Sequence, residues 1–126
     1  MSWIHQLILV GLGGGLGAIC RFLAATWITR HFDTLFPWGT LTVNVLGCLL
    51  LGRLIGSSLN AVETWRLLLA IGFLGSFTTF STFGAETWCL LRNGKSSLAI
   101  AYVLTSVLLG LVAVWLGLRL SGTDKL

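Results

Sequence analysis

Residues 72–82 decide the fold class of this 126-residue chain, and they read GFLGSFTTFST. They lie midway along an apolar run between Trp65 and Trp88, yet they include five hydroxyl side chains and two glycines. Glycine weakens a helix, and Ser and Thr can bond the backbone groups that a break leaves free. We therefore expect a membrane helix that is broken near residues 75–79.

The composition places the whole chain in a membrane. Hydrophobic residues make up 56% of it, charged residues only 10%, and the mean hydropathy is +0.93. Soluble domains carry about 25% charged residues. The net charge of +4 is spread without a basic run, so nucleic acid is not an expected partner. No nucleophile–base pair is apparent, so an enzyme is not expected.

Four apolar segments are each long enough to cross hydrocarbon, which takes about 20 helical residues. They cover residues 4–29, 38–59, 66–91 and 97–119. Six tryptophans fall within a few residues of the segment ends, as in the aromatic belts of membrane proteins: Trp3, Trp27, Trp38, Trp65, Trp88 and Trp115. The prediction is a single all-α domain over residues 1–126 with four transmembrane helices.

Basic residues are almost evenly divided between the two membrane faces. The face with both termini has Arg66, Arg119 and Lys125, and the opposite face has Arg30, Arg92 and Lys95. Orientation normally follows an excess of Lys and Arg on one side. The near balance favours insertion both ways up and pairing of opposite copies as an antiparallel homodimer. The alternative is one orientation, set by the marginal Arg53 or by the insertion machinery.

Each predicted span contributes a polar or aromatic group to one layer, ~8–14 Å below the face opposite the termini. The members of this layer are Arg21, Asn44, Phe80, Phe83, Tyr102 and Ser106. Any one of them could simply bond its own helix or a neighbouring helix. Because polar groups in hydrocarbon are costly, their convergence from four helices favours a shared pathway.

The chemistry of this layer suits a small anion. Arg21 is its only fixed charge, and its other polar groups are hydrogen-bond donors. Phe80 and Phe83 lie on one helical face and offer electropositive ring edges. No carboxylate lies at mid-depth, since Glu86 is near the face opposite the termini. Carbonyls at the break would meet near the two-fold axis of an antiparallel dimer and could hold a cation there.

Three stretches together resemble the Fluc (CrcB-type) bacterial fluoride channels. They are GFLGSFTTFSTFGAET (72–87), WGTLTVNVLG (38–47) and GGGLGAICRF (13–22). The match covers all four spans in order. The sequence departs from the family pattern at Ser76, where a second glycine is common, and at Gly110, where some relatives have a hydroxyl.

The resemblance implies a passive fluoride channel of the bacterial inner membrane that exports F⁻ and reduces its toxicity. It implies an antiparallel homodimer with two pathways, each lined by both copies. Residues expected along the anion pathway are Asn44, Phe80, Phe83, Ser81, Thr82, Tyr102 and Ser106. Arg21 and Glu86 are expected at the vestibule or interface. A structural sodium ion at the dimer centre is expected on the backbone carbonyls of Gly75 and Thr78.

Three other interpretations fit the sequence less well. A small proton-coupled multidrug exporter also has four spans, but it needs a carboxylate in the first span, where this chain has Arg21. A non-transporting scaffold would tolerate changes at Asn44 or Phe80. Residues 13–18 (GGGLGA) fit a nucleotide-binding pattern, but that site needs a soluble βαβ unit. Their glycines are better explained as small-xxx-small packing pairs, Gly11/Gly15 and Gly13/Gly17.

Overall fold

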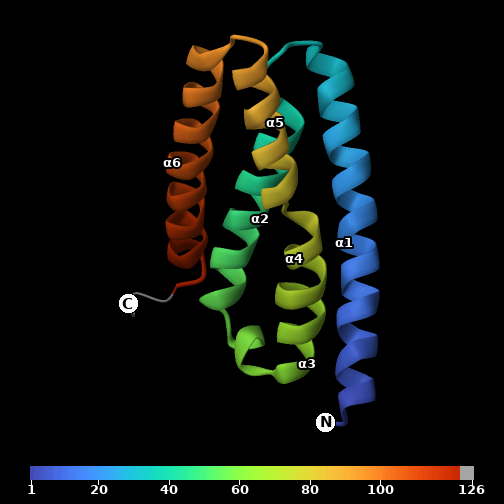
Figure 1. The fold of residues 1–126 in the computed structure, drawn as a ribbon. Helices are drawn as coiled ribbons and strands as arrows, with labels where there is room; N and C mark the ends of the chain where they lie inside the picture. Colours follow the sequence, from blue (N-terminus) through green and yellow to red (C-terminus); the bar gives the residue numbers. More distant parts are fainter. Residues whose placement is uncertain (123–126) are drawn as a thin grey trace.

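The computed structural model describes residues 1–122, and within them it contains helices and no strand. Four helical stretches are long and apolar enough to cross a membrane: Trp3–Phe32, Trp38–Ile55, Glu63–Arg92 and Ser96–Leu120. They run alternately up and down, so that the start of the first and the end of the last lie toward the same end (Figure 1). The expectation of an all-α, four-span membrane protein is confirmed. Lys125, which entered the charge count, lies outside the described residues.

Three of the predicted boundaries are shifted by three residues or more, and one of them is the start of the third span, at Glu63 in place of residue 66. Helix α1 (Trp3–Phe32) continues three residues past its expected end, and Asp33 closes it with a left-handed backbone (φ 37°). Its amide donates to the carbonyl of Thr29 at 3.2 Å. Helix α2 (Trp38–Ile55) ends four residues early, because the chain turns at Gly56 into the short 3₁₀ helix η1 (Ser58–Ala61). The connection after α1 is therefore shorter than expected, and the connection after α2 is longer.

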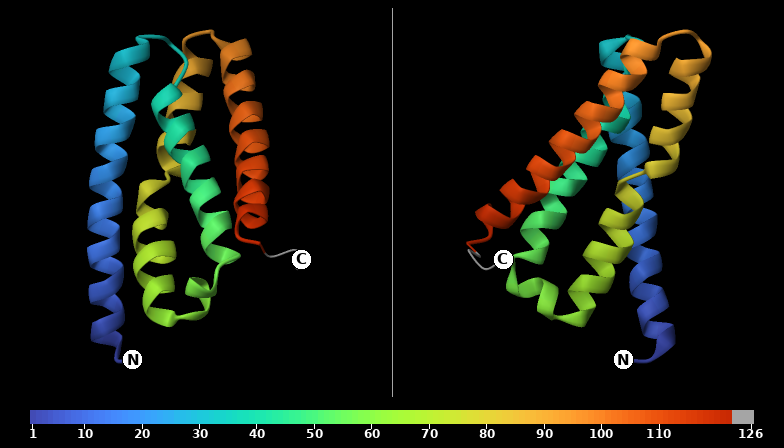
Figure 2. Two further views of the ribbon diagram at one scale, coloured as in Figure 1. Left: turned by 180° about the vertical axis from the view of Figure 1, so that it is seen from behind. Right: turned by 60° about the vertical axis from the view of Figure 1, so that its left-hand side comes forward.

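The third span consists of several helical pieces. A short α3 (Glu63–Trp65) leads into η2 (Arg66–Leu74), which has π-helical hydrogen bonding, and then α4 (Gly75–Phe77). After two residues with extended backbone, α5 (Phe80–Arg92) begins. Figure 2 shows the two halves as separate coils joined by a short link. The fourth span is α6 (Ser96–Leu120).

Glycines let the helices pack with their backbones in contact. Helix α1 packs along η2 and α4, and α2 packs along α6. A Cβ atom at Gly13 would lie 2.1 Å from the Leu68 carbonyl oxygen, and one at Gly17 would lie 2.1 Å from that of Phe73. The Gly13/Gly17 packing pair is thus confirmed. The Gly11/Gly15 pair is wrong as a contact within the chain, because nothing lies within 4 Å of either added Cβ.

Candidate functional site

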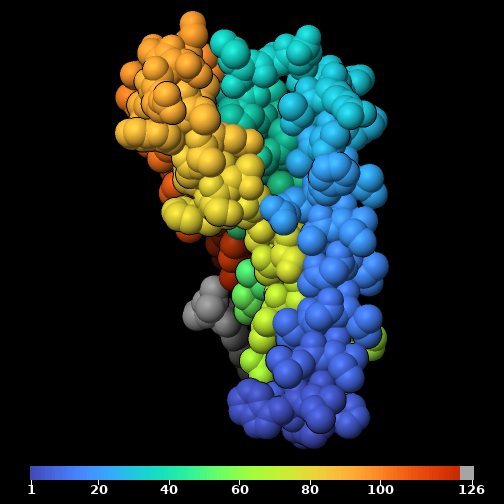
Figure 3. All heavy atoms as spheres, turned by 45° about the vertical axis from the view of Figure 1, so that its right-hand side comes forward, coloured from blue at the N-terminus to red at the C-terminus, as the bar shows by residue number. Residues whose placement is uncertain are grey.

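A groove with a volume of about 350 Å³ opens beside the gap between α4 and α5. Figure 3 shows a face on which the start of α5 (yellow) overhangs α2 (green) and α6 (red). The groove brings together six residues named from the sequence: Asn44, Gly75, Thr78, Phe80, Phe83 and Ser106. They come from α2, from the two halves of the third span and from α6. The interruption of the third span therefore forms one wall of the groove.

The side chain of Asn44 binds the backbone of the interruption at two points. Its Nδ2 donates to the carbonyl oxygen of Thr79 at 3.0 Å, and its Oδ1 accepts from the Thr79 N–H at 2.7 Å. Thr78 and Thr79 both have extended backbone, with ψ values of 159° and 117°. A single amide thus replaces the helical partners of Thr79.

The side chain of Thr79 caps the second half of the span. Its Oγ1 accepts a 3.2 Å hydrogen bond from the Thr82 N–H and donates a 3.0 Å bond to Thr82 Oγ1. Ser81 Oγ lies 3.3 Å from the same oxygen. This is the usual way in which Ser or Thr satisfies an N–H in the first turn of a helix. Ser81 is exposed and Thr82 is half-buried, and both lie at the start of α5 outside the groove lining.

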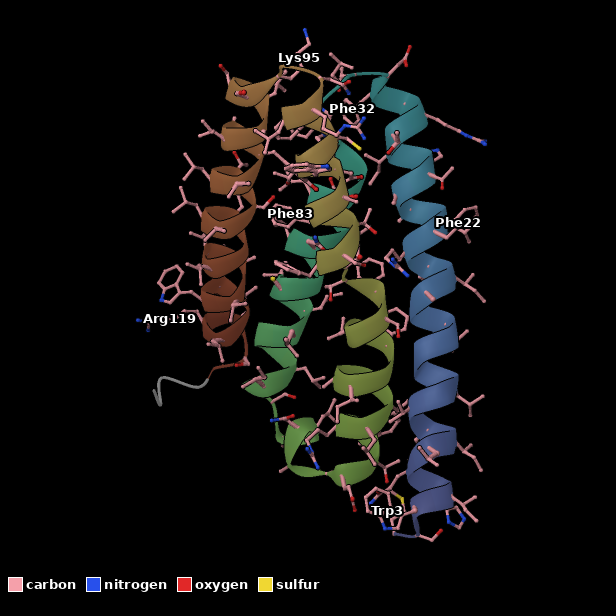
Figure 4. The ribbon with its side chains drawn as sticks, in the orientation of Figure 1. Trp3, Phe22, Phe32, Phe83, Lys95 and Arg119 are labelled. Atoms are coloured by element: carbon pink, nitrogen blue, oxygen red, sulfur yellow. The ribbon has the colours of Figure 1, made fainter. Side chains whose placement is uncertain are left out.

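The two predicted phenylalanines form the aromatic side of the groove. Phe80 is 83% exposed, and its ring centroid lies 5.7 Å from that of Phe83. Phe83 is half-buried and packs on Tyr102 at 5.1 Å, with an angle of 55° between the rings. Figure 4 shows Phe83 on the side of α5 that faces α6. One ring is therefore held by the protein, while the other projects from this copy.

Tyr102 and Glu86 form a separate polar cluster behind the aromatic side. The Tyr102 hydroxyl donates to Glu86 Oε2 at 2.7 Å, and Thr40 Oγ1 donates to Glu86 Oε1 at 2.8 Å. Tyr102 is fully buried, and neither it nor Glu86 lines the groove. Both carboxylate oxygens thus have a hydroxyl donor, and Phe83 separates this cluster from the groove.

Within residues 1–122, two predicted site residues have buried polar atoms without a hydrogen-bond partner. They are Arg21, through Nε, and Ser106, through Oγ. Ser106 is a groove residue, whereas Arg21 belongs to α1 and does not line the groove. Such atoms are costly to bury unless something else satisfies them. Each therefore has a donor available to a ligand or to another chain.

Sequence reasoning missed Thr40 and Thr79. Thr40 precedes Asn44 by four residues and so lies on the same face of α2, which was a usable signal. Thr79 precedes Thr82 by three residues, which is the spacing of a helix cap and the residue that the cap bonds. Both signals were present in the quoted stretches, but neither residue changes the hydropathy pattern.

The groove can offer donors to an anion and carbonyls to a cation. Asn44 keeps one free Nδ2 hydrogen after bonding Thr79. The Ser106 hydroxyl and the electropositive ring edges of the phenylalanines are further groups that could contact an anion. In a continuous helix the Thr79 and Thr82 N–H groups would bond the Gly75 and Thr78 carbonyls. Because these N–H groups bond side chains instead, both carbonyls have lost their helical donors.

The chain is similar to proteins of one family along almost its whole length. A family model described as "CrcB-like protein, Camphor Resistance (CrcB)" matches residues 8–118. A protein of Hahella chejuensis is 42% identical over 121 residues, or 94% of this chain and 95% of that protein. One of Methylobacillus flagellatus is 43% identical over 121 residues, or 93% and 94%. One of Phocaeicola vulgatus is 44% identical over 120 residues, or 94% and 99%. All three carry the name "Fluoride-specific ion channel FluC".

Proposed function

This chain belongs to the CrcB family, and we propose that it is a passive, fluoride-selective channel through which F⁻ leaves the cytoplasm. The observation that carries the proposal is full-length similarity, above 40% identity, to three proteins named as fluoride-specific ion channels. The proposed activity is conduction of an ion, without chemical catalysis.

The chemistry of the groove supports an anion as the permeant ion. Among the described residues that line it, none carries a carboxylate. Its polar side includes the Asn44 amide, the unpartnered hydroxyl of Ser106 and two phenylalanine rings. Donors and ring edges favour a small anion over a cation. In this proposal the anion passes along the face of Phe80 and Phe83, and Ser81, Thr82 and Tyr102 extend the polar track.

We infer that two copies pair in opposite orientations, with two pathways per dimer. The groove is open on one side in the single chain, and Phe80 projects from it with most of its surface uncovered. A second copy would close the groove and bury that ring. The near-even split of basic residues between the two faces supports opposite orientations within one membrane.

A sodium ion at the centre of this dimer fits the backbone on both sides of the interruption. Na⁺ is a hard cation that prefers oxygen ligands, and the Gly75 and Thr78 carbonyls lack their helical donors. Gly75 lies on the chain surface, where a second copy could bring an equivalent pair. A bound sodium ion supplies a fixed positive charge between the copies. Arg21 would lie at the vestibule or interface, with its Nε available to an acceptor.

The four spans make this a multi-pass membrane protein, and we place it in the bacterial inner membrane. In acidic surroundings HF crosses bilayers uncharged and dissociates in a more neutral cytoplasm. A membrane potential that is negative inside then drives F⁻ outward through a passive pore, which reduces its toxicity. Efflux of fluoride from liposomes that contain the purified protein, followed with a fluoride electrode, tests the proposal.

A further inference from the structure

At the interruption of the third span, two backbone N–H groups donate to side chains and not to the carbonyls that a helix would offer them. In a continuous helix, the N–H of Thr79 would donate to the Gly75 carbonyl and that of Thr82 to the Thr78 carbonyl. Here they donate to Asn44 Oδ1 at 2.7 Å and to Thr79 Oγ1 at 3.2 Å. Two side chains, one from α2 and one within the gap, thus take the place of two helical acceptors.

The same contacts fix which way the Asn44 amide faces. The Thr79 N–H can bond only to the amide oxygen, and the Thr79 carbonyl can bond only to the amide nitrogen. The amide cannot rotate by half a turn without losing both bonds. Its one remaining hydrogen-bonding hydrogen is on Nδ2, and Asn44 lines the groove. The amide is therefore locked with a donor free.

We propose that Asn44 and Thr79 are positioning residues that hold the interruption open. Asn44 keeps the Thr79 N–H away from the Gly75 carbonyl, and the Thr79 hydroxyl keeps the Thr82 N–H away from the Thr78 carbonyl. Both carbonyls stay available to a cation, and α5 starts in the register that aims Phe80 at the groove. The binding of a cation to these carbonyls rests on the proposed function, whereas the hydrogen bonds of Asn44 and Thr79 do not.

Hydrogen exchange at the Thr79 amide tests the Asn44 contact directly. It should be measured in nanodiscs, in fluoride-free buffer, so that a role of Asn44 in binding anions alone has no effect. Asn44→Ala should speed exchange at this amide by about tenfold or more, because the half-buried N–H loses its acceptor. If the N–H instead returns to the Gly75 carbonyl, the amide stays protected and the Na⁺ concentration for half of the stabilisation by Na⁺ rises by about tenfold or more. Ser106→Ala, which removes another polar group from the same groove without touching this contact, should leave the rate unchanged.

Further Asn44 variants show which result would contradict the proposal and which substitution should preserve the contact. Unchanged exchange in Asn44→Ala together with an unchanged stabilisation by Na⁺ overturns the proposal, and Asn44→Leu gives the same comparison if the alanine variant does not fold. Asn44→Asp retains an oxygen for the Thr79 N–H, so its exchange should stay close to that of the wild type. Its fluoride efflux should fall, because it offers the groove an oxygen in place of an N–H. Fast exchange in this variant also counts against Oδ1 as the holding group.

The Thr79 hydroxyl is tested by the response to sodium. The melting temperature should be followed while Na⁺ replaces N-methyl-D-glucamine. Thr79→Ala should raise the Na⁺ concentration for half of the effect by about tenfold or more, since the Thr82 N–H can return to the Thr78 carbonyl. Thr79→Ser should behave like the wild type. So should Thr87→Ala, because Thr87 only bonds the Phe83 carbonyl within α5.

The outcomes separate this inference from the proposed function. A wild-type protein that conducts fluoride but exchanges Thr79 freely contradicts the inference alone. A protein with a protected Thr79 and no fluoride efflux contradicts the proposed function alone. Equal sodium responses in Thr79→Ala and Thr79→Ser would contradict a role of the Thr79 hydroxyl. A wild-type protein whose melting temperature does not respond to Na⁺ would contradict the binding of a cation.

Discussion

Tyr102 donates a 2.7 Å hydrogen bond to Glu86 Oε2, across the interface between α6 and α5. Thr40 of α2 holds the other oxygen of the same carboxylate, so one glutamate ties three helices together. A carboxylate within a membrane span is costly unless its charge is satisfied. This cluster lies next to Phe83 and therefore supports the aromatic side of the groove from behind.

Removing the Tyr102 hydroxyl should destabilise the protein. Tyr102→Phe leaves Oε2 of the half-buried Glu86 without its donor, and the expected cost is about 1.5–3 kcal/mol of unfolding free energy, as for bonds to charged groups. Denaturation in mixed micelles measures it. Thr105→Val, on the same helix, is the matched control, because the Thr105 hydroxyl forms no hydrogen bond within residues 1–122. Equal stability of Tyr102→Phe and the wild type would show that the cluster is not a structural tie.

The backbone contact at Gly17 should not tolerate a side chain. Gly17→Ala would place a Cβ 2.1 Å from the Phe73 carbonyl oxygen, and overpacking of this kind costs about 1–3 kcal/mol. Unfolding in mixed micelles should therefore begin at lower denaturant. Gly11→Ala is the control, since nothing within the chain lies within 4 Å of the added atom. Similar losses in both variants would contradict the close packing of α1 against η2.

The exposed phenylalanine should be essential for flux and dispensable for folding. Phe80→Ile removes the electropositive ring edge from the groove, and flux should fall by about tenfold or more, the factor that corresponds to ~1.4 kcal/mol. The elution volume in gel filtration should not change, because Phe80 is 83% exposed in the single chain and isoleucine keeps an apolar side chain where a second copy would cover it. Phe22→Ile on α1, where the side chain is also exposed, should conduct normally. Full activity of Phe80→Ile would remove this ring from the pathway.

The near-even charge distribution predicts two orientations in one membrane. A tag at the C-terminus should be accessible from both sides of the membrane in cells, because no strong excess of Lys or Arg fixes one topology. Adding two lysines to the loop at residues 93–95 should shift the population toward one orientation. Strictly one-sided labelling of the unmodified protein would contradict the antiparallel dimer.

The membrane spans were predictable because hydropathy, tryptophan positions and short polar connections all indicate the same boundaries. The errors are at helix ends, where local capping decides. Asp33 accepts a left-handed backbone and lets α1 run on to Phe32, while Gly56 ends α2 before the apolar run is over. Composition carries little information about either choice.

The site was predictable only in part, because the sequence gives the depth of a residue in the membrane but not the contacts that its side chain makes. Depth along each helix predicted that Asn44, Phe80, Phe83 and Ser106 share a layer, and the structure places them in one groove. Depth says nothing about direction around a helix, so it did not separate Tyr102 from that groove. Depth also did not reveal that the nitrogen and the oxygen of the Asn44 amide both bond the backbone of Thr79. That contact joins two elements far apart in sequence, and no local pattern predicts it.

Selective conduction of fluoride by this chain can be measured in liposomes. Liposomes loaded with equal concentrations of KF and KCl, containing purified protein and valinomycin, should be diluted into salt of an impermeant anion, and both ions followed with selective electrodes. We expect rapid loss of fluoride with chloride retained at the level of protein-free liposomes, and slow fluoride loss from liposomes with Phe80→Ile. Equal efflux of both ions, or fluoride efflux no faster than in protein-free liposomes, would contradict it.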